Sequence, residues 1–153
     1  MIFIKPYLIE IFKITSLKTI RKILVPLDGS KYSKKALELA IGISKNQGIS
    51  ITGFHTIMLP VMSDRKIKER YQRLANKIII EAAKIAKKDG VPFYWKLQLD
   101  GYAGKEIVKF AQEGRFDLIV MGSRGPNPVA EMFLGSVANY VLNKSKIPVL
   151  LAK

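Results

Sequence analysis

Cysteine is missing from this chain of 153 residues, and histidine occurs once, as His55. Without cysteine there is no disulfide, no thiolate nucleophile and no thiolate-bound metal, and a single histidine does not make a histidine-based zinc site. Apolar runs are also short, since none reaches the roughly 18 residues that cross a bilayer. We therefore expect neither a metal site nor a membrane-spanning helix.

Acidic residues are scarce as well. Twelve Asp and Glu stand against 26 Lys and Arg, so the formal net charge is +14, which attracts nucleotides, nucleic acids and acidic lipid headgroups alike. Basic clusters occur at 31–35 and 65–73, but aromatic residues do not alternate with them as a base-stacking surface requires. Two interpretations stay open: a solvated lysine-rich surface, which we favour, and a surface that binds nucleic acid.

The length suits one domain, and strand-like and helix-like segments alternate from residue 21 onward. Apolar runs predict five strands, at 23–27, 49–57, 93–99, 117–121 and 147–152. Ser30 is a suitable N-cap for the first intervening helix, and the second is long and basic, with a predicted buried stripe of Ile67, Tyr71, Leu74, Ile78, Ala82 and Ile85. Because helical crossovers force parallel pairing, we expect a Rossmann-like α/β fold: an open five-stranded parallel sheet, order 3-2-1-4-5, with helices on both faces.

The densest motif follows the fourth predicted strand. Gly122-Ser123-Arg124-Gly125 comes directly after an apolar run, and nine residues separate it from Gly135-Ser136. Glycines let a backbone approach a ligand closely, and a helix beginning at Ser136 turns its free N–H groups toward the same space. Asp28 ends the neighbouring first strand, so both motifs meet at the crevice where open α/β sheets bind ligands. The sequence therefore predicts a phosphate cradle and nucleotide binding.

Three ordered motifs resemble the universal stress protein family. Residues 22–30 resemble its opening segment, Gly122 to Val137 is similar to its G-x2-G-x9-G pattern followed by Ser or Thr, and 147–151 is similar to its closing strand. The resemblance covers a single domain at 21–153 and implies the ATP-binding type, with an adenine nucleotide alpha hydrolase-like fold. It also implies a homodimer that pairs the last strands, here Pro148 to Ala152.

The resemblance further implies roles for eleven residues. Asp28 recognises the adenine, with backbone help from Pro26, Leu27 and Thr56, and Met121 lies beside the ribose. The remaining residues surround the ribose and phosphates; they are Gly122, Arg124, Gly125, Gly135, Ser136 and Val137. The ligand is ATP or AMP, and Mg²⁺ enters only with its phosphates.

Simpler roles stay open for some of these residues. Asp28 has an alternative role in capping the first helix or stabilising its Asp-Gly turn. Gly135-Ser136 has an alternative role as a loop end and N-cap. Arg124 has an alternative role as a surface charge when no ligand is bound. We expect His55 to be a packed or edge-strand residue rather than a functional one.

Catalytic signatures are not evident. The chain lacks the GxxxxGK[ST] and GxGxxG patterns, and Glu131 alone in the phosphate loop does not make a hydrolytic site. Our leading hypothesis is a nucleotide-sensing stress-response regulator, in which ATP or AMP orders the loop at 122–134 and changes what the dimer binds. Slow ATP hydrolysis or phosphotransfer at the same site is an alternative, and nucleotide-independent binding of nucleic acid or acidic partners is another. We expect no nucleic-acid or membrane partner.

The first twenty residues lie outside the resemblance. They are apolar but broken by charges and Pro6, so we expect no secretory leader and a cytoplasmic protein. Three roles remain open for residues 1–20: packing on the protein itself, which we favour, an anchor on a membrane surface, or an upstream start assigned in error.

Overall fold

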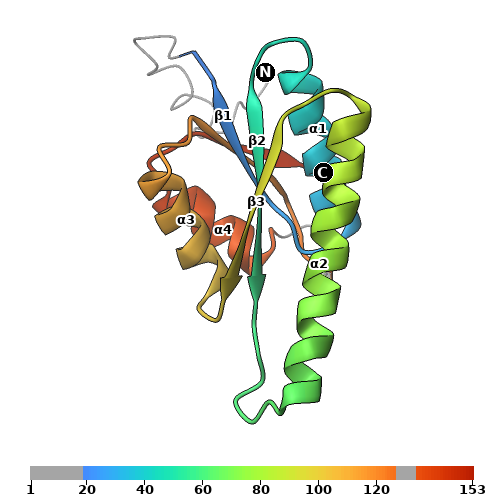
Figure 1. Ribbon diagram of the computed structural model, residues 1–153. Helices are drawn as coiled ribbons and strands as arrows, with labels where there is room; N and C mark the ends of the chain where they lie inside the picture. The colour runs from blue at the N-terminus through green and yellow to red at the C-terminus, as the bar shows by residue number, and fades with distance from the viewer. Residues whose placement is uncertain (1–18, 127–133) are drawn as a thin grey trace.

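The computed structural model describes residues 19–126 and 134–153. Within these ranges strands and helices alternate in the order β1 (Lys22–Pro26), α1 (Lys31–Ser44), β2 (Ser50–Ile57), α2 (Arg65–Lys88), β3 (Phe93–Leu99), α3 (Ala103–Glu113), β4 (Leu118–Gly122), α4 (Ser136–Lys144) and β5 (Val149–Ala152) (Figure 1). All four strand pairs are parallel, and the sheet order is β3-β2-β1-β4-β5. The predicted fold class is therefore confirmed.

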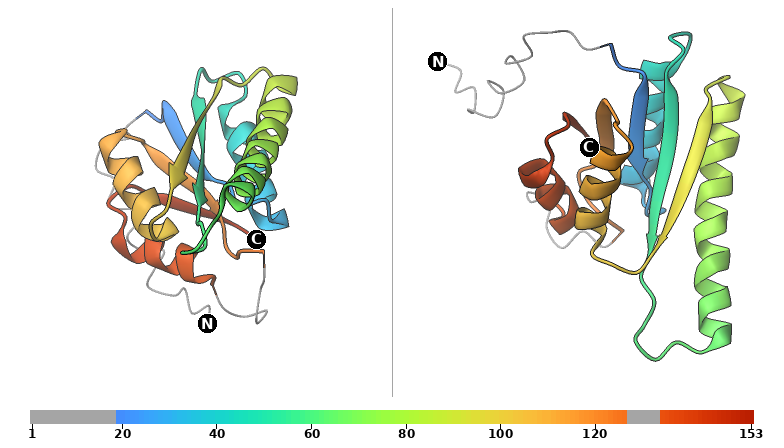
Figure 2. Two further views of the ribbon diagram at one scale, coloured as in Figure 1. Left: turned by 60° about the horizontal axis from the view of Figure 1, so that its bottom comes forward. Right: turned by 60° about the vertical axis from the view of Figure 1, so that its left-hand side comes forward.

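Helices cover both faces of the sheet, with α1 and α2 on one side and α3 and α4 on the other (Figure 2). Each face has its own apolar core. Ile23, Val25 and Ile51 point toward α1 and α2, whereas Leu24, Phe54 and Ile119 point toward α3 and α4. Alternate residues of one strand thus serve opposite layers, as expected of central strands buried on both faces.

Local signals in the sequence account for where the helices begin and end. The Ser30 hydroxyl accepts from the Ser33 N–H at 3.1 Å at the start of α1, as predicted. The Asp64 carboxylate accepts from the Ile67 N–H at 2.8 Å at the start of α2. At its other end α2 is followed by Gly90, whose φ of +70° is a left-handed conformation that glycine adopts readily.

The buried face of α2 differs from the predicted stripe. Its buried residues are Ala75, Ile79, Ala82 and Ala86, and only Ala82 was expected among them. The true face is rotated by about one residue, or 100°, from the isoleucine and leucine positions. Leu74 is exposed, and Ile78 packs only at the margin of the core. Small alanines let the helix backbone lie close to the sheet, and the larger side chains lie beside that contact.

One ion pair joins the ends of α1 and α2. The Lys45 ammonium lies 2.8 Å from Oδ1 of Asp89, and its hydrogen bond and charge lower the pKa of that carboxyl below the usual 3.8. A carboxyl whose pKa is lower in the folded protein than in the unfolded chain stabilises the fold at pH values above its unfolded pKa. This stabilisation is lost as the pH falls through its folded pKa. We expect Lys45→Met to reduce stability slightly at neutral pH and not at all in acid. Denaturant unfolding across pH checks this, and a pH-independent difference would contradict it.

The predicted N-terminal extension at 1–20 lies outside the described residues except for its last two. Of these, Ile20 packs against the core on the α1 and α2 side. In the ranges that are described, the helices are too short or too polar to cross a membrane.

Candidate functional site

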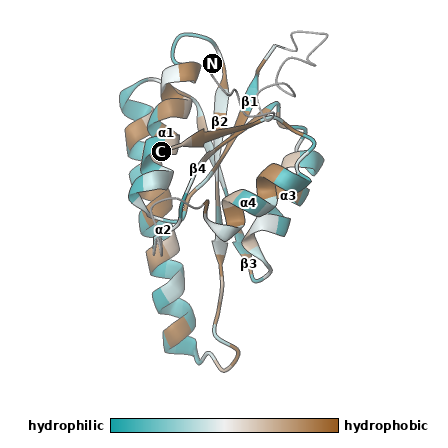
Figure 3. Ribbon diagram, turned by 180° about the vertical axis from the view of Figure 1, so that it is seen from behind, coloured by the Kyte–Doolittle hydropathy of each residue, from teal (hydrophilic) through white to brown (hydrophobic). Residues whose placement is uncertain are grey.

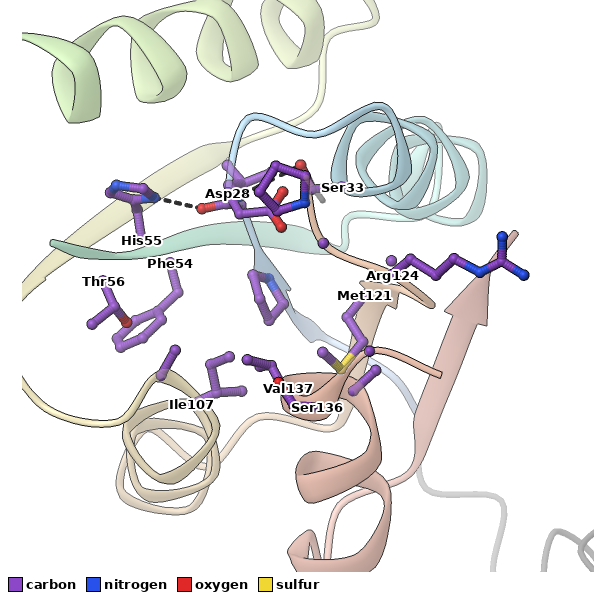
Figure 4. A pocket seen from close by; sticks show the side chains of 18 of the residues that line it. Asp28, Ser33, Phe54, His55, Thr56, Ile107, Met121, Arg124, Ser136 and Val137 are labelled. Carbon is purple, nitrogen blue, oxygen red and sulfur yellow. Dashed lines mark hydrogen bonds between the residues drawn. The ribbon is translucent and has the colours of Figure 1, made fainter. Parts of the chain in front are cut away.

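A cavity of about 700 Å³ opens at the carboxyl ends of β1 and β4 (Figure 4). The chain runs from β1 to α1 on one face of the sheet and from β4 to α4 on the other face, and the cavity lies between these two connections. The structure brings all the residues selected from the sequence to its walls: Pro26, Leu27, Asp28, Thr56, Met121, Gly122, Arg124, Gly125, Gly135, Ser136 and Val137. Segments more than 100 positions apart thus form one site.

Asp28 lies at the end of β1, where its two carboxylate oxygens have different surroundings. Oδ1 accepts from the Ser30 N–H at 2.9 Å, which stabilises the turn into α1. Oδ2 lies beside Gly125 in the cavity lining, since a Cβ placed on that glycine would be 3.6 Å from it. The turn-stabilising role that we left open therefore uses one oxygen and does not occupy the second.

The backbone of Thr56 also faces this cavity. On β2, the Phe54 carbonyl accepts from the Leu27 N–H at 2.8 Å, toward β1, and the Ile57 carbonyl accepts from the Asp100 N–H at 2.9 Å, toward β3. Because backbone groups alternate between the two neighbours along a strand, those of Thr56 point toward β1. β1 ends opposite Phe54, so the Thr56 backbone looks into the space beyond its end.

His55 is a cavity residue that reasoning from the sequence missed. Its ring lines the cavity, and Nδ1 lies 2.6 Å from the Leu27 carbonyl oxygen (Figure 4). A carbonyl only accepts, so Nδ1 carries the proton and donates. Both backbone groups of Leu27 are thereby engaged within the protein, which leaves Thr56 as the better placed of the two to read a base edge. The one feature of the sequence that could have indicated this role is that His55 directly precedes Thr56, a predicted site residue, on the same strand.

Two glycines allow the close approach of segments at the cavity. A Cβ on Gly122 would lie 2.8 Å from the backbone carbon of Tyr32, so β4 passes the start of α1 at a distance that only glycine permits. The Gly135 N–H donates to the Ser123 carbonyl at 2.9 Å. This bond ties the start of α4 to the end of β4.

The starts of α3 and α4 reach the cavity without a side-chain cap. Their N-cap residues are Tyr102 and Gly135, and neither makes a side-chain cap hydrogen bond, in contrast to Ser30 and Asp64 on the other face of the sheet. The first backbone N–H groups of a helix have no partner inside the helix. At α4 these donors and the positive end of the helix dipole suit an anion. Ser136 begins the helix, and the N-cap is Gly135.

Arg124 lines the cavity, but its side chain extends away from it (Figure 4). Nη1 donates to the Tyr32 hydroxyl at 3.4 Å, and the guanidinium carbon is 5.8 Å from the centre of the ring. The Lys31 ammonium lies 5.1 Å from the same ring. This arrangement corresponds to the alternative of a surface charge in the unliganded protein. A new rotamer is needed for Arg124 to contact a phosphate.

Metal-binding side chains are not grouped in the part of the chain that the structure describes, where no three His, Asp or Glu converge. Glu131 and most of the predicted phosphate loop, 127–133, lie outside the described residues. The described residues bring an acidic group and helix N–H donors to the lining of one cavity.

Comparison with known proteins gives a consistent result. The sequence model of the universal stress protein family matches residues 19–153. The universal stress protein MJ0531 of Methanocaldococcus jannaschii is 31% identical over 140 residues, covering 87% of this chain and 82% of the relative. The solved structure of MJ0577 from the same organism has a TM-score of 0.70 at 29% identity, covering 89% of this chain and 97% of its own. The Archaeoglobus fulgidus universal stress protein in complex with dAMP has a TM-score of 0.69 at 23% identity, covering 87% and 98%.

Proposed function

The chain belongs to the universal stress protein family, and from that premise we propose that its cavity binds an adenine nucleotide, ATP or AMP. The observation that carries the proposal is the convergence of eleven residues from four separate segments on one cavity of about 700 Å³. Ligand pockets for small molecules have volumes of about 300–1,000 Å³. A family member of the same fold is known in complex with dAMP, which supports an adenine ligand.

The cavity lining offers groups that suit both the base and the phosphates of a nucleotide. Asp28 and the Thr56 backbone offer acceptors and a donor to an adenine edge, because the exocyclic amine donates and the ring nitrogens accept. The start of α4 offers N–H donors and the Ser136 hydroxyl to phosphate. Met121 and Val137 supply apolar surface in the same lining. Mg²⁺, when present, is carried by the phosphates.

We further propose that the protein acts as a sensor rather than an enzyme, through a homodimer. β5 is an edge strand of the sheet, so its outer backbone groups can pair with a second copy. Leu150, in the middle of β5, is exposed. Nucleotide-dependent ordering of the loop at 122–134 remains part of this proposal, and its central residues lie outside those described. Equal protease sensitivity of that loop with and without ATP would contradict it.

The binding proposal is tested by releasing and then adding nucleotide. Freshly purified protein is denatured, any released nucleotide is identified by mass spectrometry, and ATP and AMP are titrated into the stripped protein. We expect Asp28→Ala to weaken binding by about ten- to a hundredfold, since a hydrogen bond to a charged group contributes about 1.5–3 kcal/mol.

Two further variants separate the causes of such a loss. Asp28→Asn keeps an oxygen for the Ser30 turn and removes the charge, so its melting temperature should match that of the parent while its affinity falls. Glu113→Ala removes an exposed carboxylate at the end of α3, outside the cavity lining, and should bind normally. Full affinity in both Asp28 variants would contradict the proposal that Asp28 contacts the bound nucleotide.

A further inference from the structure

The connection between β2 and α2, together with the first part of α2, projects beyond the body of the protein. Figures 1 and 2 show this corner as the part of the described chain farthest from the sheet on that side. Between residues 58 and 74 no residue is buried, and the buried positions of α2 begin only at Ala75. Ten residues of helix and the loop before them therefore lie outside the core.

This corner exposes apolar side chains where a soluble surface usually has polar ones. Met58, Val61 and Met62 are 63%, 100% and 92% exposed. With Ile67 and Leu74 they make five of the fourteen exposed large apolar residues in the described ranges. Figure 3 shows the hydrophobic loop at the free end of α2. Grouped exposed apolar residues mark an interaction site more often than single ones do.

Basic residues follow this apolar loop along the first turns of α2. Arg65, Lys66, Lys68, Arg70 and Arg73 are all exposed, and they lie within about 12 Å along the helix axis. Against them stand Asp64, which caps the helix, and Glu69, which is 2.8 Å from Arg65. The corner at 58–74 thus has a net charge of +3 from five basic and two acidic residues.

We propose that this corner docks on an anionic lipid surface, with the loop at 58–62 inserted among the headgroups and the basic residues of α2 above it. Apolar insertion combined with basic residues is the pattern of peripheral membrane attachment. A nucleic acid is less suited, because its phosphates would use the charges and leave Val61 and Met62 in water. A second copy is less suited, because it would bring two basic clusters together.

The length of α2 supports an external partner. Helices gain most of their stability from packing an apolar face, yet none of the first ten residues of α2 is buried and only Tyr71 among them is half-buried. The Asp64 cap and the Arg65–Glu69 pair hold this segment helical, each with a small effect. This inference is independent of nucleotide binding, and it departs from our expectation of no membrane partner, which did not consider an exposed apolar loop beside the basic cluster.

The test is co-sedimentation of the full chain with vesicles of phosphatidylcholine alone or mixed with phosphatidylserine. We expect binding only to the mixed vesicles, and weaker binding as salt screens the charges. The pair Val61→Ser and Met62→Ser should reduce the affinity about tenfold without changing net charge. The triple variant Lys66→Gln, Lys68→Gln, Arg70→Gln should reduce it by about a hundredfold, at about fivefold for each charge.

A matched control removes three charges elsewhere: Lys105→Gln, Lys109→Gln and Lys144→Gln, all exposed on α3 and α4. It should bind as the parent does. The proposal fails if no vesicle binding occurs, or if the control loses as much affinity as the triple variant. It also fails if the Val61 and Met62 pair binds normally, which would leave the N-terminal segment or overall charge as the cause. Light scattering that shows self-association lost in that pair, or duplex DNA binding lost only in the triple variant, would replace it with a dimer or a nucleic-acid site.

Discussion

Gly122→Ala is expected to weaken nucleotide binding at least tenfold and to lower stability by about 1–3 kcal/mol, the usual cost of overpacking. The added Cβ would lie 2.8 Å from a backbone carbon of Tyr32 and 3.0 Å from the Ser33 nitrogen. Neither atom is at the end of a flexible side chain, so β4 or the first turn of α1 has to move. Both segments form walls of the cavity, and the displacement is transmitted to Asp28 and Gly125.

Gly42→Ala is the matched control for this substitution. Gly42 lies in α1, and an added Cβ would have no atom within 4 Å apart from its chain neighbours and the backbone of its own helix; alanine favours a helix over glycine by up to about 1 kcal/mol. It should melt slightly higher than the parent and bind normally. Calorimetric titration and thermal melting of the two variants give the comparison. Normal affinity in Gly122→Ala would mean that the close approach of β4 to α1 is structural and unrelated to the ligand.

Leu24→Ala is expected to produce the largest loss of stability, about 2–5 kcal/mol. Leu24 is 0% exposed in the central strand of the sheet and packs in the layer formed with α3 and α4. Its partners come from both sides, since β1 pairs with β2 and β4. Because these pairings hold the backbone in place, the surrounding side chains can fill the space only in part. Chemical denaturation at equilibrium measures the difference.

Leu39→Ala is the matched control, because it makes the same substitution at an exposed position. Leu39 lies on α1 and is 40% exposed, so its truncation should change stability by no more than about 0.5 kcal/mol. A loss at Leu24 as small as that at Leu39 would mean that the two-layer core described here does not carry the stability of the domain.

Where the chain marks both ends of an element clearly, the sequence alone predicts its bounds. β3 occupies the predicted 93–99 because Pro92 precedes it and the Asp100-Gly101 turn follows, with φ of 54° and 95°. The last strand is shorter than predicted, beginning at Val149 rather than Ile147. Pro148 has no N–H for a ladder, so the apolar run there extends beyond the strand.

Features that depend on packing between distant segments could not be predicted from the sequence. The periodicity of α2 contains two plausible stripes, and the choice depends on how closely Ala75 and Ala82 let the helix approach the sheet. His55 enters the cavity because β1 ends before β2 does, and no local signal sets that difference. The direction of the Arg124 side chain depends on Tyr32, 92 positions earlier. In contrast, the meeting of Asp28 with Gly125 followed from strand order alone.

The contrast between capped and uncapped helices has a thermodynamic consequence. On the α1 and α2 face the protein completes its own helices, whereas at the cavity α3 and α4 begin without side-chain caps. In the complex that we propose, a ligand phosphate at the start of α4 would act as the missing cap, so part of its binding free energy would stabilise the first turn of that helix. Under the proposed function, local order at the start of α4 would then signal nucleotide occupancy without a domain movement.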